Sequence, residues 1–255
     1  MSKETELIAN LSQNYRSVTF SDIRVVSPGF IIDPDIKDEN GLTFDVGIKG
    51  RKESIISYDL TAFAVLYNDR IGIVLDDRAN RVRKNIGNAF IAGTESLINV
   101  NFLKWWAPKN TSYKISSFLN SSFSFSEYLS SEENNVVGKR VEFIPAVNIK
   151  TGLDLSYKNL QFVYQIGYLS KQYTDVQNSS IAAQGDSRSG LIGEIPAYQI
   201  SDVTLTYKIG KFKFDAGINN LFNSAYFTRR ATGYPGPGII PSDGRSFFFT
   251  AMIKT

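Results

Sequence analysis

Arginine is the residue type in this sequence that is best suited to chemistry at a binding site. A guanidinium group donates two parallel hydrogen bonds to a carboxylate or a phosphate, so neighbouring arginines can hold an anionic ligand. One basic cluster in a polar stretch consists of Arg78, Arg81, Arg83 and Lys84. These side chains could instead pair with nearby acids such as Asp76 and Asp77. The residue types alone therefore indicate anion binding without identifying the anion.

Catalysis is not predicted, because the residues that most enzymes need are absent. The chain has no cysteine and no histidine, which excludes thiolate metal sites, histidine ligands and histidine general bases. Adjacent acids such as Glu132 and Glu133 are typical of a solvated polar stretch. The glycine-rich stretch 233–238 lacks the Lys-Ser/Thr pair and the helix that follow a phosphate-binding loop. We expect neither an enzyme nor a resident metal or cofactor.

Nucleic acid is not an expected partner either. The formal net charge is only +3, so bulk electrostatics do not favour a polyanion. Basic residues are not interleaved with aromatic residues on one face, as single-strand binding would require. No stretch reaches the roughly 18 consecutive apolar residues of a membrane-spanning helix.

The elements that must position the arginines are predicted to be β-strands, because apolar and polar residues alternate along most of the chain. Successive side chains of a strand point to opposite faces, so each such segment has one apolar and one polar face. The alternation predicts about nine strands, many about nine to eleven residues long, which is the length of a tilted strand that crosses an outer membrane. The expected strands are 42–49, 56–66, 90–102, 113–125, 149–157, 160–168, 203–209, 212–218 and 247–253.

The connections between these strands alternate between short and long. Short breaks are expected near 50–54, 104–112, 157–160 and 209–211, and long polar ones near 67–88, 127–147, 171–197 and 221–245. Transmembrane barrels have short periplasmic turns at one rim and long extracellular loops at the other, whereas a β-sandwich has mostly short connections. The alternation of short and long connections favours the membrane interpretation. It also places the end of the last strand at the periplasmic rim.

The charged residues support the same interpretation. They fall on the polar side of their strands, at Lys49, Asp59, Lys150, Asp154, Asp202, Lys208, Lys213, Asp215 and Lys254. A soluble lipocalin-like barrel would bury one face as a core, so a charged inner face argues against it. Trp105 and Trp106 lie at a predicted short turn, where amphipathic rings suit a membrane interface. The alternative is that these two tryptophans cap the end of an ordinary sheet.

The last third of the chain carries a family resemblance. The segments Asn220-Leu221-Phe222-Asn223 and Gly244-Arg245-Ser246-Phe247 resemble the C-terminal elements of TonB-dependent outer-membrane receptors. Further upstream, 33–39 resembles the loop that enters a mid-barrel strand in that family, and Gly87-Asn88-Ala89 resembles another recurrent segment. The composition of the loops and the closing run of phenylalanines look most similar to those of receptors of the ferric-citrate type.

The resemblance implies a fold and a domain division. Members have an antiparallel up-and-down barrel of the 22-stranded type with a plug inside it. This chain is expected to be all-β and to supply about nine strands of such a barrel, without the plug, as an open curved sheet. Residues 1–40 are expected to be the remnant of an extracellular loop, and residues 41–255 the C-terminal barrel part. The two open edges are expected at about 42–50 and 246–254.

The resemblance also implies a function. It predicts uptake of a ferric siderophore or ferric citrate across the outer membrane of a Gram-negative bacterium, driven by TonB through the plug. The iron would arrive with the substrate, and lipid and lipopolysaccharide would be the other partners. A passive porin-like or adhesin-anchoring barrel is the alternative function.

Substrate is captured by extracellular loops in this family, so the candidates lie on the long connections. The expected substrate-binding residues are Arg78, Arg81, Arg83, Arg188, Tyr226, Arg229 and Arg230. The alternative role for the arginines is to bind lipopolysaccharide phosphates or to pair with acids in the loops.

Overall fold

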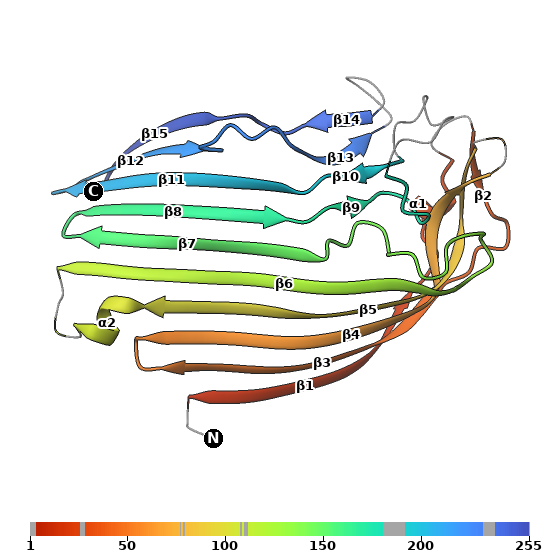
Figure 1. The fold of residues 1–255 in the computed structure, drawn as a ribbon, viewed down its shortest axis with the longest axis horizontal. Coiled ribbons are helices and arrows are strands. Elements are labelled where there is room, and N and C mark those ends of the chain that lie inside the picture. The colour runs from red at the N-terminus through yellow and green to blue at the C-terminus, as the bar shows by residue number, and fades with distance from the viewer. Residues whose placement is uncertain are drawn as a thin grey trace.

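The fold is a single antiparallel sheet that remains open (Figure 1). The computed structural model describes residues 4–25, 29–76, 78, 80–107, 109, 112–180, 192–231 and 238–254. The main strands, in their order across the sheet, are β1 (Thr5–Arg16), β3 (Glu39–Lys52), β4 (Ile56–Leu75), β5 (Arg81–Asn101), β6 (Tyr113–Ser131), β7 (Val147–Tyr157), β8 (Leu160–Leu169), β11 (Tyr198–Ile209), β12 (Phe212–Asn219) and β15 (Ser246–Ile253). The all-β, antiparallel, unclosed architecture confirms the expected fold class.

A short helix and five short strands lie at one end of this sheet. They are α1 (Phe20–Ile23), β2 (Phe30–Ile32), β9 (Gln172–Tyr173), β10 (Glu194–Ile195), β13 (Phe227–Ala231) and β14 (Gly238–Pro241). At this end, which we call the loop end, the long connections join the strands (Figure 1). The opposite end, the turn end, carries the short connections and the helix α2 (Phe102–Trp106). None of the helices that the structure describes is long and apolar enough to cross a bilayer.

The two faces of the sheet differ in chemistry, as the alternation predicts. Leu11 of β1 lies opposite Phe44 of β3, and Phe214 of β12 lies opposite Ala251 of β15, all on the apolar face. No second layer covers this face within the described residues, so its side chains stay exposed; Leu11 and Phe249 are each 70% exposed. The other face carries the charges, with Lys114 of β6 paired to Asp154 of β7 at 2.5 Å and Lys213 paired to Asp215 at 2.8 Å.

Glycines on the polar face make room for aromatic rings from the neighbouring strand. Gly152 lies directly opposite Phe118, and Gly217 lies directly opposite Phe248. A Cβ atom at Gly152 would lie 2.4 Å from the Phe118 ring, and one at Gly217 would lie 2.3 Å from the Phe248 ring. Each ring therefore lies across a glycine and covers its backbone, which a larger side chain would prevent.

The Asn-Leu-Phe-Asn segment has a structural role at the end of β12. Asn220 and Asn223 both adopt the left-handed conformation, with φ of 50° and 54°, which asparagine tolerates better than most residues. The Asn220 side chain accepts a hydrogen bond from the Ser224 amide at 2.8 Å, and the Asn223 side chain accepts one from the Arg245 amide at 2.9 Å. The motif thus ties the end of β12 to the chain that enters β15.

Two predictions about the strands are wrong. Residues Thr5–Arg16 were expected to be loop but form β1, which pairs with β3 along its whole length, so the first edge of the sheet is β1 rather than 42–50. The other expected edge, at β15, is confirmed. The expected long connection 67–88 is mostly strand, because β4 continues to Leu75 and β5 begins at Arg81. A register shift between Tyr67 and Ile71 interrupts the alternation there, with Asp69 at a φ of 54°.

The principal hydrophobic core lies at the loop end rather than between two sheets. It consists of Ile86, Ala89, Tyr128, Val136, Val141 and Val176, with Tyr67, Val74, Ile91 and Ile144 packed against it. These residues come from β4, β5, β6 and the connections 132–146 and 170–193. The core therefore fixes the long connections onto the extended strands and shapes the surface at the loop end.

Candidate functional site

A cavity of about 580 Å³ opens at the loop end, beside the hydrophobic core. Strands β1, β4 and β5, the segment with α1, and the connections 132–146, 170–197 and 220–245 all contribute to its wall. Five guanidinium groups and four carboxyl groups line it, from Arg16, Arg70, Arg81, Arg83, Arg230, Asp22, Glu39, Glu142 and Asp175. Apolar side chains such as Ile73 and Phe143 complete the wall. A volume of this size suits a small-molecule ligand.

Arg70 sits at the base of the cavity in a closed polar triangle. Its Nη1 donates to Glu142 Oε1 at 2.6 Å and to the Tyr128 hydroxyl at 2.6 Å, while that hydroxyl donates to Glu142 Oε2 at 2.8 Å. Burial alone would lower the pKa of Arg70, but the Glu142 carboxylate outweighs it and raises that pKa above its usual value. Burial raises the pKa of the Tyr128 hydroxyl. Arg70 therefore remains charged and compensated inside the protein.

A second polar cluster joins Arg16, Asp22, Glu39 and Arg83. Arg16 Nη2 lies 2.7 and 2.8 Å from the two carboxylate oxygens of Asp22, and Arg83 Nη1 lies 3.8 Å from one of them. Arg16 Nη1 also lies 3.4 Å from Glu39. Burial alone would raise the pKa of Asp22, but hydrogen bonds from Thr19 and Arg16 hold it below its usual value. The carboxylates and guanidinium groups thus alternate along this part of the wall.

The local sequence positions Asp22 by a helix cap. Thr19 precedes α1, and its amide and hydroxyl donate to Asp22 Oδ2 at 2.9 and 2.6 Å. This is the reciprocal capping arrangement, in which an acid at the third helical position reaches back to the residue before the helix. It directs the Asp22 carboxylate toward Arg16 and Arg83.

Arg81 and Arg83 flank an aromatic ring. Strand β2 pairs in parallel with the start of β5, so that Phe30 lies beside Arg81 and Ile32 beside Arg83. The guanidinium carbons of Arg81 and Arg83 lie 5.4 and 5.2 Å from the centre of the Phe30 ring. These cation–π contacts favour the placement of both guanidinium groups beside the ring at the cavity wall.

Arg230 enters the cavity from β13. Its guanidinium carbon lies 5.6 Å from the Phe227 ring centre, and its Nη2 donates to the Glu194 carbonyl at 3.1 Å. Its Nε is buried and has no hydrogen-bond partner among the described residues. Tyr226 packs against Tyr198 at 4.8 Å between ring centres, and Arg229 is exposed.

The structure brings three of the seven predicted residues together at the cavity, namely Arg81, Arg83 and Arg230. Arg78 is exposed at the tip between β4 and β5, whereas Tyr226 and Arg229 lie on β13 or just before it and do not line the cavity wall as described. Arg188 lies outside the described residues. Lys84, in the same basic cluster of the sequence, pairs with Glu133 at 2.7 Å. Whether any of these residues binds substrate stays a prediction.

Sequence reasoning missed Arg16 and Arg70. Arg16 ends β1, a strand in which Leu7, Ala9 and Leu11 mark one face, but Ile8 between them weakens the alternation as a signal. Arg70 lies just before Ile71, Ile73 and Leu75, which alternate with Gly72 and Val74 and could have extended the predicted strand.

The cavity has only a slight excess of positive charge. Five guanidinium groups face four carboxyl groups, which leaves one formal positive charge. Burial raises the pKa of Asp175. An anionic ligand can therefore bind here through arginine, but it must compete with carboxylates of the protein.

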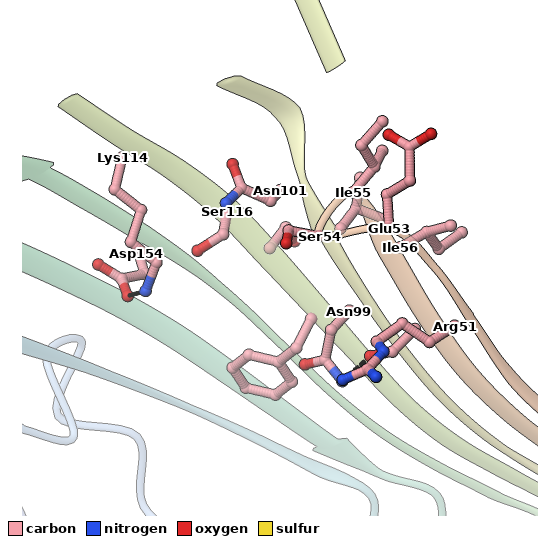
Figure 2. Close-up of a pocket in the computed structure, with 14 residues that line it drawn as sticks. Arg51, Glu53, Ser54, Ile55, Ile56, Asn99, Asn101, Lys114, Ser116 and Asp154 are labelled. Carbon is pink, nitrogen blue, oxygen red and sulfur yellow. Dashed lines mark hydrogen bonds and ion pairs between the residues drawn. The ribbon is translucent and has the colours of Figure 1, made fainter. Parts of the chain in front are cut away.

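A second hollow lies at the turn end, on the polar face (Figure 2). It has a volume of about 370 Å³, and Arg51 is the one arginine among the described residues that line it. Figure 2 shows Lys114 joined to Asp154, with Asn101 beside Ser116 and Asn99 beside Arg51. No group of three or more metal-ligating side chains occurs in the described part of the chain. The cluster of arginines thus distinguishes the loop end.

Comparison with known proteins agrees with this architecture. The family model described as "TonB dependent receptor-like, beta-barrel" matches residues 2–221. A search of curated proteins returned no match. Among solved structures, the chain is similar to the unliganded ferric citrate transporter FecA, with a TM-score of 0.78 and 19% identity over 98% of this chain and 36% of that one.

Two further structures show the same fold. The ferric yersiniabactin uptake receptor FyuA from Yersinia pestis has a TM-score of 0.73 and 14% identity over 99% of this chain and 35% of that one. The copper transporter OprC has a TM-score of 0.72 and 15% identity over 98% of this chain and 37% of that one. The chain thus spans little more than a third of the length of each of these proteins.

Proposed function

The chain belongs to the TonB-dependent receptor-like β-barrel family, and from this we propose that it forms part of an outer-membrane receptor for uptake of a ferric siderophore or ferric citrate. One observation carries the proposal. A single-layered sheet keeps an uncovered apolar face and a charged face, and it places a cavity rich in arginine at its loop end.

The two-faced sheet supports the membrane location. A water-soluble protein would cover so many exposed apolar side chains with a second layer, whereas lipid covers them in a barrel wall. Closure with further strands would satisfy the two open edges, β1 and β15. We therefore place the apolar face against lipid of a Gram-negative outer membrane, with the turn end at the periplasm. The exposed rings of Trp105 and Trp106 at α2 suit that interface.

The cavity supports the choice of substrate. Its guanidinium groups can donate paired hydrogen bonds to the carboxylates of a ferric chelate, and the iron remains bound to the chelate. At the loop end the cavity faces the outside of the cell, where such a chelate arrives. We propose that transport is driven by TonB through a plug domain lying outside the described residues. Lipopolysaccharide would then contact the exposed loop-end basic residues such as Arg78.

Ligand binding tests the proposal, since transport would require the plug. The chain refolded in detergent is titrated calorimetrically with ferric citrate, with a ferric siderophore and with metal-free citrate. We expect binding of at least one ferric chelate. Arg81→Gln and Arg230→Gln should each weaken it about tenfold to a hundredfold, as removal of a charged hydrogen bond does. Arg51→Gln at the turn end is the matched control and should leave the affinity unchanged.

The result would contradict the proposal if no ferric chelate bound, or if the loop-end and turn-end variants behaved alike. A passive porin-like or adhesin-anchoring barrel would use the same two-faced sheet without a ligand at the arginines. Absence of binding in every variant would favour that alternative.

A further inference from the structure

Arg16 and Arg83 come from distant strands and meet at one carboxylate. Arg16 ends β1 and Arg83 lies near the start of β5, and Asp22 of α1 sits between them at 2.7 and 3.8 Å. Arg16 Nη2 contacts both oxygens of the Asp22 carboxylate. Two guanidinium groups around one carboxylate form the arrangement in which proteins bind a carboxylate ligand. Here the protein supplies that carboxylate itself.

The site is part of the cavity wall. Arg16, Asp22, Glu39 and Arg83 all line the cavity of about 580 Å³, although only 4% of Asp22 is exposed. Arg16 and Arg83 keep 43% and 21% of their side chains exposed, so a ligand in the cavity can reach both guanidinium groups. Glu39 lies 3.4 Å from Arg16 and also accepts a hydrogen bond from the Ile71 amide at 2.5 Å. That second contact fixes Glu39 to β4, so Arg16 keeps one carboxylate when the other leaves.

Few apolar contacts hold α1 in place. The helix has a single turn, and its large side chains point to solvent, with Phe20 77% and Ile23 52% exposed. The described polar contacts of α1 itself with the wall are those of Asp22 with the two arginines and the hydrogen bond from Arg83 to the Ser21 carbonyl. Releasing α1 therefore exposes little additional apolar surface.

We propose that Arg16 and Arg83 form an anion subsite, that Asp22 occupies it when the cavity is empty, and that a carboxylate of the bound ligand replaces Asp22 and releases α1. This inference rests on the proposed function, because it takes the ferric chelate as the source of the carboxylate. The exchange replaces one carboxylate by another, so both guanidinium groups keep a counter-charge, which matters most for Arg83, whose side chain is only 21% exposed. The attachment of the segment with α1 to the wall therefore depends on whether the cavity holds a ligand.

The proposal makes Asp22 a competitor of the ligand. An intramolecular competitor lowers the apparent affinity by the fraction of molecules in which the subsite is free. Removing its charge should therefore strengthen binding, which a purely structural ion pair would not do. Asp22→Asn keeps the shape of the side chain and an oxygen that can accept the hydrogen bonds from Thr19.

The test compares Asp22→Asn with Asp38→Asn in the full chain, using ferric citrate as the probe. Asp38 is a matched control, because it anchors the same segment through Tyr15 and the Val18 amide and is bonded to no arginine by any contact described. We expect Asp22→Asn to bind the probe about tenfold more tightly and Arg83→Gln to bind it more weakly. Asp38→Asn should strengthen binding much less than Asp22→Asn, because Asp38 holds the segment but does not compete for the two arginines. In the unmodified chain, ferric citrate should speed hydrogen exchange of residues 17–25.

The outcomes separate the two proposals. If ferric citrate binds with the expected dependence on Arg81 and Arg230, but Asp22→Asn binds no more tightly, the carboxylate exchange is wrong and the receptor function stands. Protection of residues 17–25 by the probe would overturn the exchange as well. If no variant binds any ferric chelate, both proposals fall. Unchanged exchange of residues 132–146 in Asp22→Asn would show that the variant is folded.

Discussion

Replacing Glu142 with glutamine removes the carboxylate that compensates Arg70 at the base of the cavity. The side chains of Arg70 and Glu142 are only 20% and 9% exposed, and they lie 2.6 Å apart. Tyr128, which bonds to both, belongs to the hydrophobic core with Val136 and Val141. The triangle therefore joins β4 and β6 to the connection 132–146.

The expected loss of stability in Glu142→Gln follows from the burial of Arg70 and Glu142. Removing one partner of a buried ion pair destabilises a protein by about 3–5 kcal/mol, because the remaining charge stays buried without compensation. The Tyr128 hydroxyl can still accept a bond from Arg70, so we expect about 3 kcal/mol for Glu142→Gln. Lys84 and Glu133 offer a control, since they join β5 to the same connection 132–146, but the Glu133 side chain is 24% exposed whereas that of Glu142 is 9% exposed. A more exposed pair of this kind contributes about 0.2–1 kcal/mol.

The assay is hydrogen exchange read by mass spectrometry, because local opening of a loop need not unfold the sheet. Glu142→Gln should speed exchange of residues 132–146 and 171–178 by about a hundredfold, which corresponds to the expected loss of free energy. Glu133→Gln should change it by less than about fivefold. Equal effects of the two variants would refute the reasoning that the buried triangle holds the loops.

Three further predictions concern the sheet and α1. Gly152→Ala should lower stability by about 1–3 kcal/mol in urea unfolding, because its Cβ would lie 2.4 Å from Phe118; Gly167→Ala, whose Cβ would lie 3.7 Å from Lys150, is the control. In vesicles, Leu205→Arg on the apolar face should cost about 2–4 kcal/mol, and Thr204→Arg on the polar face should cost much less; similar values would argue against lipid contact. The pKa of Asp22 in the folded protein lies below its ordinary value of 3.8. The contribution of Asp22 to stability is therefore complete above pH 3.8, and it is lost as the pH falls through the lower pKa of the folded state. The pKa of Asp38 is lowered as well. A spin label at Phe20→Cys should therefore become more mobile in acid, and its mobility should stay unchanged from pH about 5 to 8. A mobility that rises with pH would contradict the assigned contacts.

Much of the sheet could be predicted from the sequence, because strand periodicity is a local property. Alternation at Leu42–Lys49 or Phe212–Asn219 assigns each side chain to a face without knowledge of the partner strand. The two missed features have local causes. In β1 only Leu7, Ala9 and Leu11 mark the apolar face, and in β4 the register shift after Tyr67 places polar residues where the alternation would require apolar ones.

The candidate site was less predictable, because it is assembled from residues far apart in the chain. The sequence indicates which arginines are available, but Arg16, Arg70, Arg81 and Arg230 come from different strands, and they meet only when the long connections fold over the loop end. Their compensation is equally non-local, since Glu142 lies 72 residues from Arg70. A carboxylate neutralises a guanidinium group only at contact distance, and no spacing in the sequence reveals that distance.

The sequence by itself therefore determined most of the strands, their two chemically distinct faces and the absence of histidine and cysteine chemistry. The tertiary structure alone decided that β1 is an edge, that the core lies under the loops, and which arginines line one cavity with carboxylates beside them. The physical reason is that side-chain direction along a strand depends on neighbours one or two residues away. Burial and charge pairing depend instead on residues that only folding brings together.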